Sequence, residues 1–348
     1  MERILGMEFI PAKTIISGYA DGNSWFGENY NMNIYKGCCH GCIYCDSRSE
    51  CYRIEDFDHV RAKDNALDLI ARELRSKRRK GVVGTGAMSD PYNPFERELR
   101  LTRGALELVD AHGFGASIAT KSDLVTRDID MLAAIKTHSP VLVKITVTTA
   151  DDELCRKIEP RAPVASRRFS AIRQLAGNGI FAGILLMPVL PFIEDNDDNV
   201  VSIIRLASDA GARFIYPAFG VTLRQNQREW YYSKLDEHFP GLRLKYARQF
   251  GNAYECHSSR ASQLWRVFCS ECDRLGILHK MEDIIEAYRQ PYSRTQLSLF
   301  LIGPHAPHSP YPTHCSPGSR GSQLQCWYQG STLARRQPRG YPRLSVCT

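Results

Sequence analysis

From about residue 30 to residue 217, short β-rich runs alternate with amphipathic stretches at helical spacing. The runs with strand character are Asn31–Tyr35, Gly81–Gly84, Ala116–Ala119, Val141–Thr148, Ile180–Met187 and Phe214–Tyr216. The clearest helical stretches between them are Asp64–Arg79, Thr102–His112, Arg127–Lys136, Ser166–Gly177 and Asn199–Ala210. Strands joined by helices of this length pair in parallel, which predicts an α/β barrel or part of one, with an open doubly wound sheet as the alternative. In either fold, ligands bind in the loops that follow the strands.

The rest of the 348-residue chain divides by composition. Residues 221–300 have the pattern of a helical extension, in which Gln263–Leu275 is the clearest helix. Residues 301–348 contain five arginines, no lysine and no acidic residue, and 18 of these 48 positions are Pro, Gly or Ser. We expect this tail to be disordered. The chain then comprises an N-terminal segment (1–29), a barrel (30–220), the extension and the tail.

Charge and cysteine content restrict the compartment and the partners. The net charge is +7, but five of the 45 cationic residues lie in the tail, which leaves +2 for the first 300 residues. The overall charge therefore does not by itself predict nucleic-acid binding, although a local basic groove is still compatible with it. The sequence contains no apolar run long enough for a membrane span or a secretory signal, so we expect a cytoplasmic protein without membrane contact. Its twelve cysteines should then be free thiols or metal ligands.

The strongest local signal is the run GCCHGCIYC, which begins at Gly37 directly after the first predicted strand. Cys38, Cys42 and Cys45 have the spacing Cys-x3-Cys-x2-Cys. Three thiolates from one short loop can bind three irons of a cubane cluster and leave the fourth iron open to a small ligand. The glycines at 37 and 41 allow the backbone to wrap around such a cluster at low steric cost.

A zinc site is the alternative interpretation of these cysteines. Cys39, Cys42 and Cys45 could form a tetrahedral thiolate site, alone or with Cys269 and Cys272, and the chain would then be a non-enzymatic zinc-binding module. The position of the loop after the first of six strands in an α/β pattern favours the cluster.

Four further motifs surround this loop. They are Tyr35–Cys38 (YKGC), Gly84–Pro94 (GTGAMSDPYNP), Thr120–Ser122 (TKS) with Arg127-Asp128, and Glu159–Pro163 (EPRAP). Together with the cysteine loop they resemble the spore photoproduct lyase-like family, often described as DNA repair photolyase-like, of the radical S-adenosylmethionine (SAM) superfamily. The resemblance runs from about residue 8 to residue 300.

The resemblance implies a partial (β/α)6 barrel of the TIM type, the fold of radical SAM proteins. It also implies a [4Fe–4S] cluster and SAM as cofactors, with a one-electron reductant such as flavodoxin or ferredoxin. The implied reaction is reductive cleavage of SAM to a 5′-deoxyadenosyl radical, which abstracts hydrogen from the substrate. A nucleic-acid repair or modification reaction is the leading interpretation, and a peptide or small metabolite is the alternative substrate.

Matching positions imply roles for individual residues. Cys38, Cys42 and Cys45 would ligate the cluster, and the residues expected to contact SAM are Tyr44, Ser89, Lys121, Thr146 and Arg161. Lys121, at the end of the third strand, would bind the methionyl carboxylate. Arg161 would serve the cofactor or an anionic substrate, with Glu159 as its orienting partner. Ordinary explanations stay open: a solvated Lys121, a strand-forming Thr146 and a loop ion pair between Glu159 and Arg161.

One position departs from the family. The photoproduct lyases carry a cysteine after the second strand that returns hydrogen to the product radical, and Ala87 occupies that position here. Since alanine has no hydrogen of useful bond strength to transfer, the thymine-dimer reaction itself is not carried over to this chain. The candidate replacement donors are Cys39, Cys51, Cys155, Cys256 and Tyr92.

The segment QLSLF resembles the short peptide by which many bacterial DNA-repair and replication proteins bind the sliding clamp. Its anchoring residues would be Gln296, Leu297, Leu299 and Phe300. The apolar side chains can fill pockets while the glutamine amide fixes orientation. The alternative is that the segment folds back on its own barrel. If it does dock, the partners are the clamp and DNA.

Overall fold

The computed structural model describes residues 7–19, 25–86 and 88–293. Its main sheet has seven strands in the order β10-β9-β8-β7-β6-β3-β2. These strands are β2 (Ile16–Gly18), β3 (Tyr30–Met32), β6 (Val82–Thr85), β7 (Gly115–Thr120), β8 (Val141–Thr146), β9 (Ala182–Leu186) and β10 (Ile215–Pro217). The last six run parallel, whereas β2 pairs antiparallel with β3 at one edge. This confirms the predicted partial (β/α)6 barrel.

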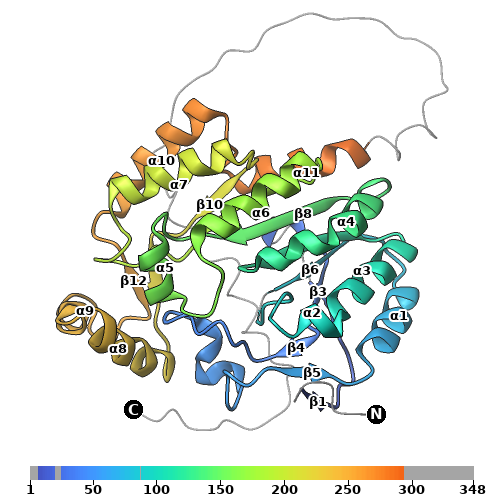
Figure 1. The fold of residues 1–348 in the computed structure, drawn as a ribbon, viewed down its shortest axis with the longest axis horizontal. Helices are drawn as coiled ribbons and strands as arrows, with labels where there is room; N and C mark the ends of the chain where they lie inside the picture. The colour runs from blue at the N-terminus through green and yellow to red at the C-terminus, as the bar shows by residue number, and fades with distance from the viewer. Residues whose placement is uncertain (1–6, 20–24, 87, 294–348) are drawn as a thin grey trace, which may run out of the picture. The chain divides into compact units, whose positions relative to one another are not determined.

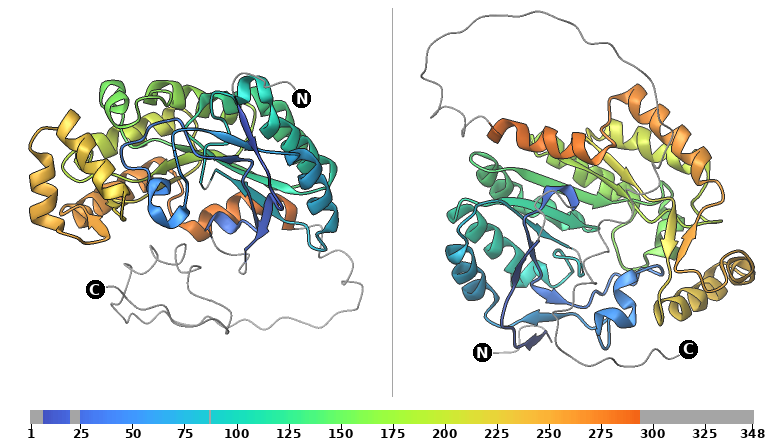
Figure 2. Two further views of the ribbon diagram at one scale, coloured as in Figure 1. Left: turned by 90° about the horizontal axis from the view of Figure 1, so that it is seen from below. Right: turned by 180° about the vertical axis from the view of Figure 1, so that it is seen from behind.

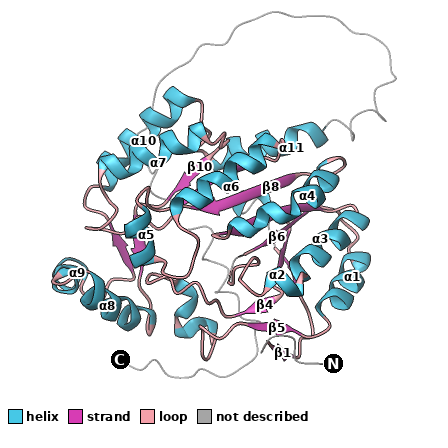
Figure 3. Cartoon of the chain, viewed as in Figure 1, coloured by secondary structure: helices cyan, strands magenta, loops and turns pink. Residues whose placement is uncertain are grey.

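Helices cover the outer face of this sheet, as Figures 1 and 3 show. The covering helices are α1 (Ala66–Ser76), α3 (Leu101–Ala111), α4 (Ile129–Lys136), α6 (Ala165–Gly177) and α7 (Asp197–Asp209), whereas α2 (Glu96–Leu99) and α5 (Asp152–Ile158) belong to the segments that follow β6 and β8. The five helices expected from periodicity are all present, and α2 and α5 are additions. Caps mark several of the starts: the Asn196 side chain accepts a hydrogen bond from the backbone N–H of Asn199 at the start of α7.

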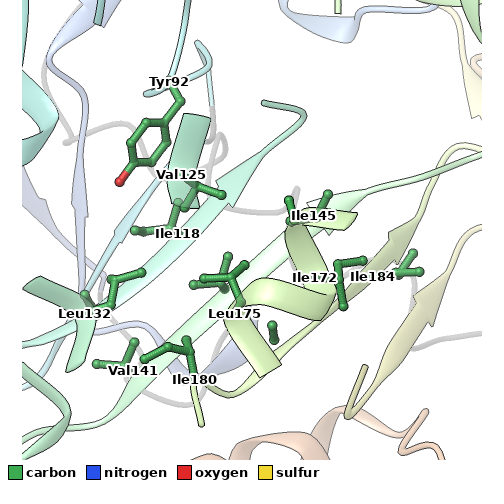
Figure 4. Packing of buried hydrophobic residues seen from close by; sticks show 14 of the residues in the cluster. Tyr92, Ile118, Val125, Leu132, Val141, Ile145, Ile172, Leu175, Ile180 and Ile184 are labelled. Carbon is green, nitrogen blue, oxygen red and sulfur yellow. The ribbon is translucent and has the colours of Figure 1, made fainter. Parts of the chain in front are cut away.

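The strands bury both faces, and alternate residues have different neighbours. Val143 and Ile145 of β8 belong to the main core between the sheet and the helices. Figure 4 shows Ile145 in this layer, close to Ile172 of α6. Lys144, which lies between Val143 and Ile145, points to the opposite face of the strand, into the barrel. There it is buried in an ion pair with Glu28.

Glu28 also accepts a hydrogen bond from Ser117 of β7 (2.8 Å) and lies over Gly84 of β6, where a Cβ would collide with its carboxylate. The N-terminal segment therefore places inside the barrel the buried ring of Phe26 and a buried carboxylate that is paired with Lys144 and hydrogen-bonded to Ser117. Further hydrogen bonds of this kind help a buried ion pair to be tolerated.

A second, three-stranded sheet carries the cysteine loop. Its order is β1 (Glu8–Ile10), β5 (Arg61–Lys63) and β4 (Tyr35–Lys36). The predicted strand Asn31–Tyr35 is thus split: β3 stays in the barrel, and β4 leaves it to join this small sheet. The cysteine loop begins directly after β4, and its residues contact the segments that follow β6, β7 and α5.

The C-terminal extension is helical, as expected, with one small antiparallel sheet. It consists of β11 (Gly220–Thr222), α8 (Gln227–His238), α9 (Leu242–Phe250), β12 (Glu255–His257), α10 (Ala261–Leu275) and α11 (Met281–Ser293). Helix α10 matches the predicted Gln263–Leu275 and ends at Gly276 in the left-handed region. It packs on α7, whereas α8 and α9 lie at one end of the molecule in both views of Figure 2.

Among the described residues, no helix has the length and apolarity needed to cross a bilayer. The predicted tail, the clamp-like residues Gln296, Leu297, Leu299 and Phe300, and Ala87 lie outside the described residues.

Candidate active site

Hydrogen bonds from the segment that follows α5 hold the cysteine loop in place. The backbone N–H of Ile43 donates to the carbonyl oxygen of Ile158 (2.9 Å), and that of Arg161 donates to the carbonyl oxygen of His40 (3.0 Å). The loop and this segment therefore pair much as two strands would. Because Ile43 and Ile158 are both fully buried, the pairing is protected from water.

Two further contacts fix the ends of the loop. Gly37 has a φ of 82°, and a Cβ there would lie 2.6 Å from the carbonyl oxygen of His59 and 2.7 Å from that of Phe57. Only glycine fits this approach. At the other end, the buried amide of Gln227 donates to the carbonyl oxygen of Tyr44 (2.9 Å), so α8 of the extension supports the loop directly.

The three predicted ligands fit a cluster. Cys38, Cys42 and Cys45 are free thiols, and each lies close enough to another to affect its ionisation. Burial raises the pKa of Cys38 to about 12 and raises the pKa values of Cys42 and Cys45. Such thiols stay protonated unless a metal or a cation stabilises the thiolate. Three of them from one loop, grouped beside a lysine, provide the donor set for an iron–sulfur cluster with one open iron.

The zinc alternative has no geometric support. Within the described ranges, no three His, Cys, Asp or Glu side chains are grouped as ligands of a single metal ion would be. Cys272 lies in the main core with Cys269 packed against it, whereas Cys42 and Cys45 pack in a separate cluster. Cys42 and Cys45 therefore do not share a packing cluster with the α10 cysteines, which argues against the alternative zinc site that combines loop cysteines with Cys269 and Cys272.

Lys121 lies close enough to the Cys42 and Cys45 thiols to interact with them electrostatically. Burial alone would lower the pKa of its ammonium, but the Cys42 thiolate and the Glu159 carboxylate raise it above its ordinary value. Its Nζ is 4.0 Å from Glu159 and 5.5 Å from the centre of the Tyr44 ring. The Lys121 side chain is 20% exposed, so the solvated-cation explanation does not apply.

Glu159 lies beneath the loop in a network of buried polar groups. It accepts a hydrogen bond from the hydroxyl of Tyr44, and Arg168 of α6 lies 2.5 Å from its other oxygen. Although burial alone would raise the pKa of Glu159, the Arg168 and Lys121 cations lower it below its ordinary value. A carboxylate therefore anchors the aromatic residue of the cysteine motif from below.

The expected pairing of Glu159 with Arg161 is wrong. Arg161 pairs instead with Asp58 (2.6 Å), and its side chain is 56% exposed on the outer side of the loop. There its guanidinium lies over Gly41, where a Cβ would approach its Nε and Nη2 to 3.2 Å. Glu159 turns inward because Arg168 offers a fully buried cation, whereas Arg161 follows the backbone outward.

Ser89 and Thr146 both lie near the loop, but they differ in the hydrogen bonds that they make. The hydroxyl of Ser89 donates to the carbonyl oxygen of Tyr35 at the end of β4 (3.1 Å), so it has a structural partner. Thr146 is the last residue of β8, and its carbonyl oxygen accepts from Arg168 (2.9 Å). Both are buried at the carboxyl end of the sheet.

Sequence reasoning missed Thr148 and Glu194, two buried polar residues in the segments that follow β8 and β9. The amide of Asn199 donates to the carbonyl oxygens of Thr148 (2.9 Å) and Glu194 (3.1 Å), which brings the ends of β8 and β9 together. Burial raises the pKa of Glu194, while the nearby Thr148 hydroxyl partly offsets this effect. Neither Thr148 Oγ1 nor Glu194 Oε1 makes a hydrogen bond of normal geometry with the described residues. Buried polar groups in the segments that follow the barrel strands fit a polar ligand, because α/β proteins bind their ligands there. The signal was available for Thr148, which shares a face with Thr146.

The five candidate hydrogen donors are scattered. Tyr92 lies in the core layer of Figure 4, and its hydroxyl donates to a buried carboxylate there. Cys155 is buried in α5 behind the loop, Cys256 is buried in β12, and Cys51 is exposed. Only Cys39, half-buried, belongs to the loop itself. The structure therefore does not assemble these residues around one point.

Comparison with known proteins agrees with this geometry. The sequence profile of the radical SAM superfamily matches residues 32–207, which span the loop and the barrel strands up to the end of α7. The chain belongs to the radical SAM superfamily. The cofactors of this superfamily are a [4Fe–4S] cluster and SAM, as predicted.

The similar proteins extend this result. An uncharacterized protein of Mycobacterium tuberculosis is 30% identical over 224 residues, covering 62% of this chain and 66% of that protein. One from Methanocaldococcus jannaschii is 35% identical over 172 residues, covering 49% of this chain and 63% of that protein. This radical SAM chain thus spans just under two thirds of the length of these relatives.

Solved structures share the fold. Spore photoproduct lyase complexed with dinucleoside spore photoproduct has a TM-score of 0.57 at 14% identity, covering 77% of this chain and 80% of that one. A mutant of the lyase with bound AdoMet and dinucleoside spore photoproduct has a TM-score of 0.54 at 15% identity. The match covers 72% of this chain and 75% of the lyase chain. The predicted likeness to this lyase is confirmed at the level of fold.

Proposed function

We propose that this chain is a radical SAM enzyme that cleaves SAM reductively and uses the resulting radical on a nucleic acid, in a repair or modification reaction. The observation that carries the proposal is a group of three thiols beside Lys121 in one supported loop, Cys42 buried and Cys38 and Cys45 half-buried. The fold shared with spore photoproduct lyase supports the substrate class.

Cys38, Cys42 and Cys45 would hold the cluster. When bound, the cluster and SAM supply a reducing electron and a 5′-deoxyadenosyl radical. The task of the protein is to position these groups and to exclude water. The buried packing of the loop against Ile158 and Leu190 serves that exclusion.

Lys121 and Tyr44 would orient SAM. The ammonium of Lys121 lies next to the cysteines, where it offsets thiolate charge and can donate to the methionyl carboxylate. Tyr44 is fixed by its bond to Glu159, so its ring has one orientation. Thr146 at the end of β8, and Thr148 and Glu194 in the segments after β8 and β9, would offer hydroxyl and carboxyl groups to the remaining polar groups of SAM.

Arg161 is not part of this cofactor set, because it extends to the outer side of the loop. Ser89 would support β4 rather than touch SAM, since its hydroxyl is already bonded there. Of the candidate hydrogen donors, Cys39 is the one we retain, since it lies in the cysteine loop. We do not propose the thymine-dimer reaction, since Ala87 stands at the position of the donor cysteine.

A peptide or small metabolite is the second candidate substrate, favoured by the net charge of only +2 over the first 300 residues. A reductant such as flavodoxin or ferredoxin must supply the electron, and a cytoplasmic location is consistent with that need. Binding of the sliding clamp through Gln296, Leu297, Leu299 and Phe300 stays a prediction from the sequence.

Anaerobic reconstitution with iron and sulfide, followed by reduction in the presence of SAM, tests the proposed reaction. We expect 5′-deoxyadenosine from the wild type and none from Cys38→Ala, Cys42→Ala or Cys45→Ala, whereas Cys269→Ala, remote from the loop, should retain both iron and product. Iron retained by the three loop variants would contradict the ligand assignment.

The substrate class needs a separate measurement. Adding single-stranded or ultraviolet-treated DNA should raise the rate of 5′-deoxyadenosine formation above the background seen without substrate. A rise with peptides or metabolite mixtures and none with nucleic acid would favour the second candidate.

A further inference from the structure

A cavity of about 270 Å³ opens on the outer side of the cysteine loop. Its walls come from four segments: the cysteine loop after β4, the loops after β6 and β7, and the segment between α5 and α6, which belongs to the connection from β8 to β9. It therefore lies at the carboxyl edge of the sheet, where α/β proteins bind their ligands. No residue assigned above to SAM, other than the displaced Arg161, lines it.

Three arginines converge on this cavity, which we call the arginine pocket. Arg97 reaches it from α2, Arg161 from the segment after α5, and Arg167 from α6. Asp123 is the one acidic residue of the lining, and Asp58 pairs with Arg161 just outside it. The pocket thus keeps a formal surplus of one positive charge even when both carboxylates are counted.

The two carboxylates orient the guanidinium groups without saturating them. One oxygen of Asp123 accepts a hydrogen bond from Nε of Arg167 (2.8 Å) and lies 2.5 Å from its Nη2 in an ion pair. Asp58 accepts from Nη2 of Arg161 at 2.6 Å. Since a guanidinium has five N–H donors, both arginines keep donors for a ligand. Their side chains are 58% and 56% exposed, so these donors are accessible.

The chemistry of the pocket selects a phosphate. Several guanidinium groups in fixed orientation match the multiple acceptor oxygens of a phosphate better than they match a single carboxylate. The volume lies just below the range of roughly 300–1,000 Å³ typical of sites that enclose a whole small molecule. It suits a phosphate with part of the attached sugar, while the remainder of the ligand extends beyond the pocket.

We propose that the arginine pocket binds a backbone phosphate of the nucleic-acid strand whose target nucleotide enters the barrel. His40 of the cysteine loop forms one wall of the pocket, so a strand held there lies one loop away from the three thiols. The pocket fixes the register of the strand and leaves recognition of the base to the barrel. This inference rests on the proposed function, because it names how the substrate of that site is held.

The test uses the reconstituted holoenzyme under anaerobic conditions, with the variants Arg97→Gln, Arg167→Gln and the double variant. Arg243→Gln is the matched control, because Arg243 is an equally exposed arginine with one carboxylate partner, on α9 outside the pocket. The probes are a fluorescent single-stranded oligonucleotide, an abasic oligomer of the same length, and inorganic phosphate. Anisotropy over a range of salt concentrations gives the affinity and its salt dependence.

We expect the double variant to bind both oligomers about tenfold more weakly, with a salt slope lower by about one to two, while Arg243→Gln stays within about twofold of the wild type. The double variant should lose as much affinity for the abasic oligomer as for the oligonucleotide, because the pocket contacts phosphate and not a base. Basal formation of 5′-deoxyadenosine should be unchanged in every variant. Unchanged melting temperatures would show that the variants fold.

Two results would overturn the proposal. If the double variant binds both oligomers like the wild type, the pocket holds no strand. If, in addition, inorganic phosphate binds the wild type but not the double variant, the pocket is a site for free phosphate rather than for nucleic acid. Failure of the proposed function gives a different pattern, because the wild type itself would then form no 5′-deoxyadenosine or would show no rise in its formation with nucleic acid.

Discussion

Replacing Arg168 with methionine tests whether the buried network under the cysteine loop is an electrostatic necessity. Arg168 is 1% exposed and lies 2.5 Å from Glu159. It also donates to the carbonyl oxygens of Pro163 (2.6 Å) and Thr146 (2.9 Å). Methionine has a similar length and fills the space, but it removes the charge and all three of these contacts.

The expected cost follows from what remains. Glu159 stays buried, and the nearest cation left to it is Lys121 at 4.0 Å. Removing one partner of a buried ion pair typically costs about 3–5 kcal/mol, because the other charge is left without compensation. At about 2 °C per kcal/mol for a chain of this size, the melting temperature should fall by roughly 6–10 °C. Thermal unfolding followed by circular dichroism measures this.

Two companion variants separate charge from packing. In the double variant E159Q/R168M, both charges are gone and the glutamine can still accept from Tyr44, so at least half of the lost stability should return. R243M removes an exposed arginine whose ion pair with Asp236 is open to solvent, and it should cost less than about 1 kcal/mol.

The reasoning is refuted if R168M melts within about 2 °C of the wild type, since a loss that small corresponds to about 1 kcal/mol. It is also refuted if E159Q/R168M is less stable than R168M. The first result would mean that Lys121 alone satisfies Glu159. The second would mean that Arg168 stabilises the protein through its backbone contacts and not through its charge.

Two further predictions concern the loop and the extension. Gly37→Ala should abolish iron incorporation because the new Cβ meets two carbonyl oxygens, whereas Gly113→Ala, also at positive φ but with nothing within 4 Å, should cost only about 1–2 kcal/mol and keep its iron. Equal iron contents would refute the steric argument. In α10, hydrogen bonds from Arg274 and Arg205 lower the pKa of Glu271 to about 2. The stability that the Glu271 carboxylate contributes to the folded protein is therefore fully present above pH 4.5 and is lost as the pH falls through about 2. The gap in melting temperature between wild type and Glu271→Gln should close over that interval, and a gap that widens would contradict this sign.

The sequence predicted the barrel because central parallel strands such as β8 and β9 are buried on both faces and the longer crossover helices have an apolar period. The run Val141–Thr148 is an example, and it appears as β8. The short strands β1, β2 and β4 were not foreseen. Segments of two or three residues carry no periodicity, and their pairing depends on partners far along the chain, as with β1 and β5.

The site was predictable where spacing alone determines geometry. Cys38, Cys42 and Cys45 lie in one loop, so their grouping follows from the sequence. The partner of Glu159 does not follow in this way. Arg161 is two residues away along the chain, but the backbone turns it outward, and the cation that compensates Glu159 comes from α6. Which arginine pairs with Glu159 depends on which one is buried beside it. Burial depends on how the helices pack, not on distance along the sequence.

Adjacent arginines at the start of α6 show how one segment can serve two purposes. Arg167 and Arg168 follow each other in the chain, but one is 58% exposed in the arginine pocket and the other is 1% exposed beneath the cysteine loop. Successive helical residues point about 100° apart, so a single turn can face both solvent and core. Loss of Arg168 should therefore reduce stability, whereas loss of Arg167 should weaken nucleic-acid binding and leave the melting temperature unchanged. If both variants lost the same property, the division of this segment into an inner support and an outer binding surface would be wrong.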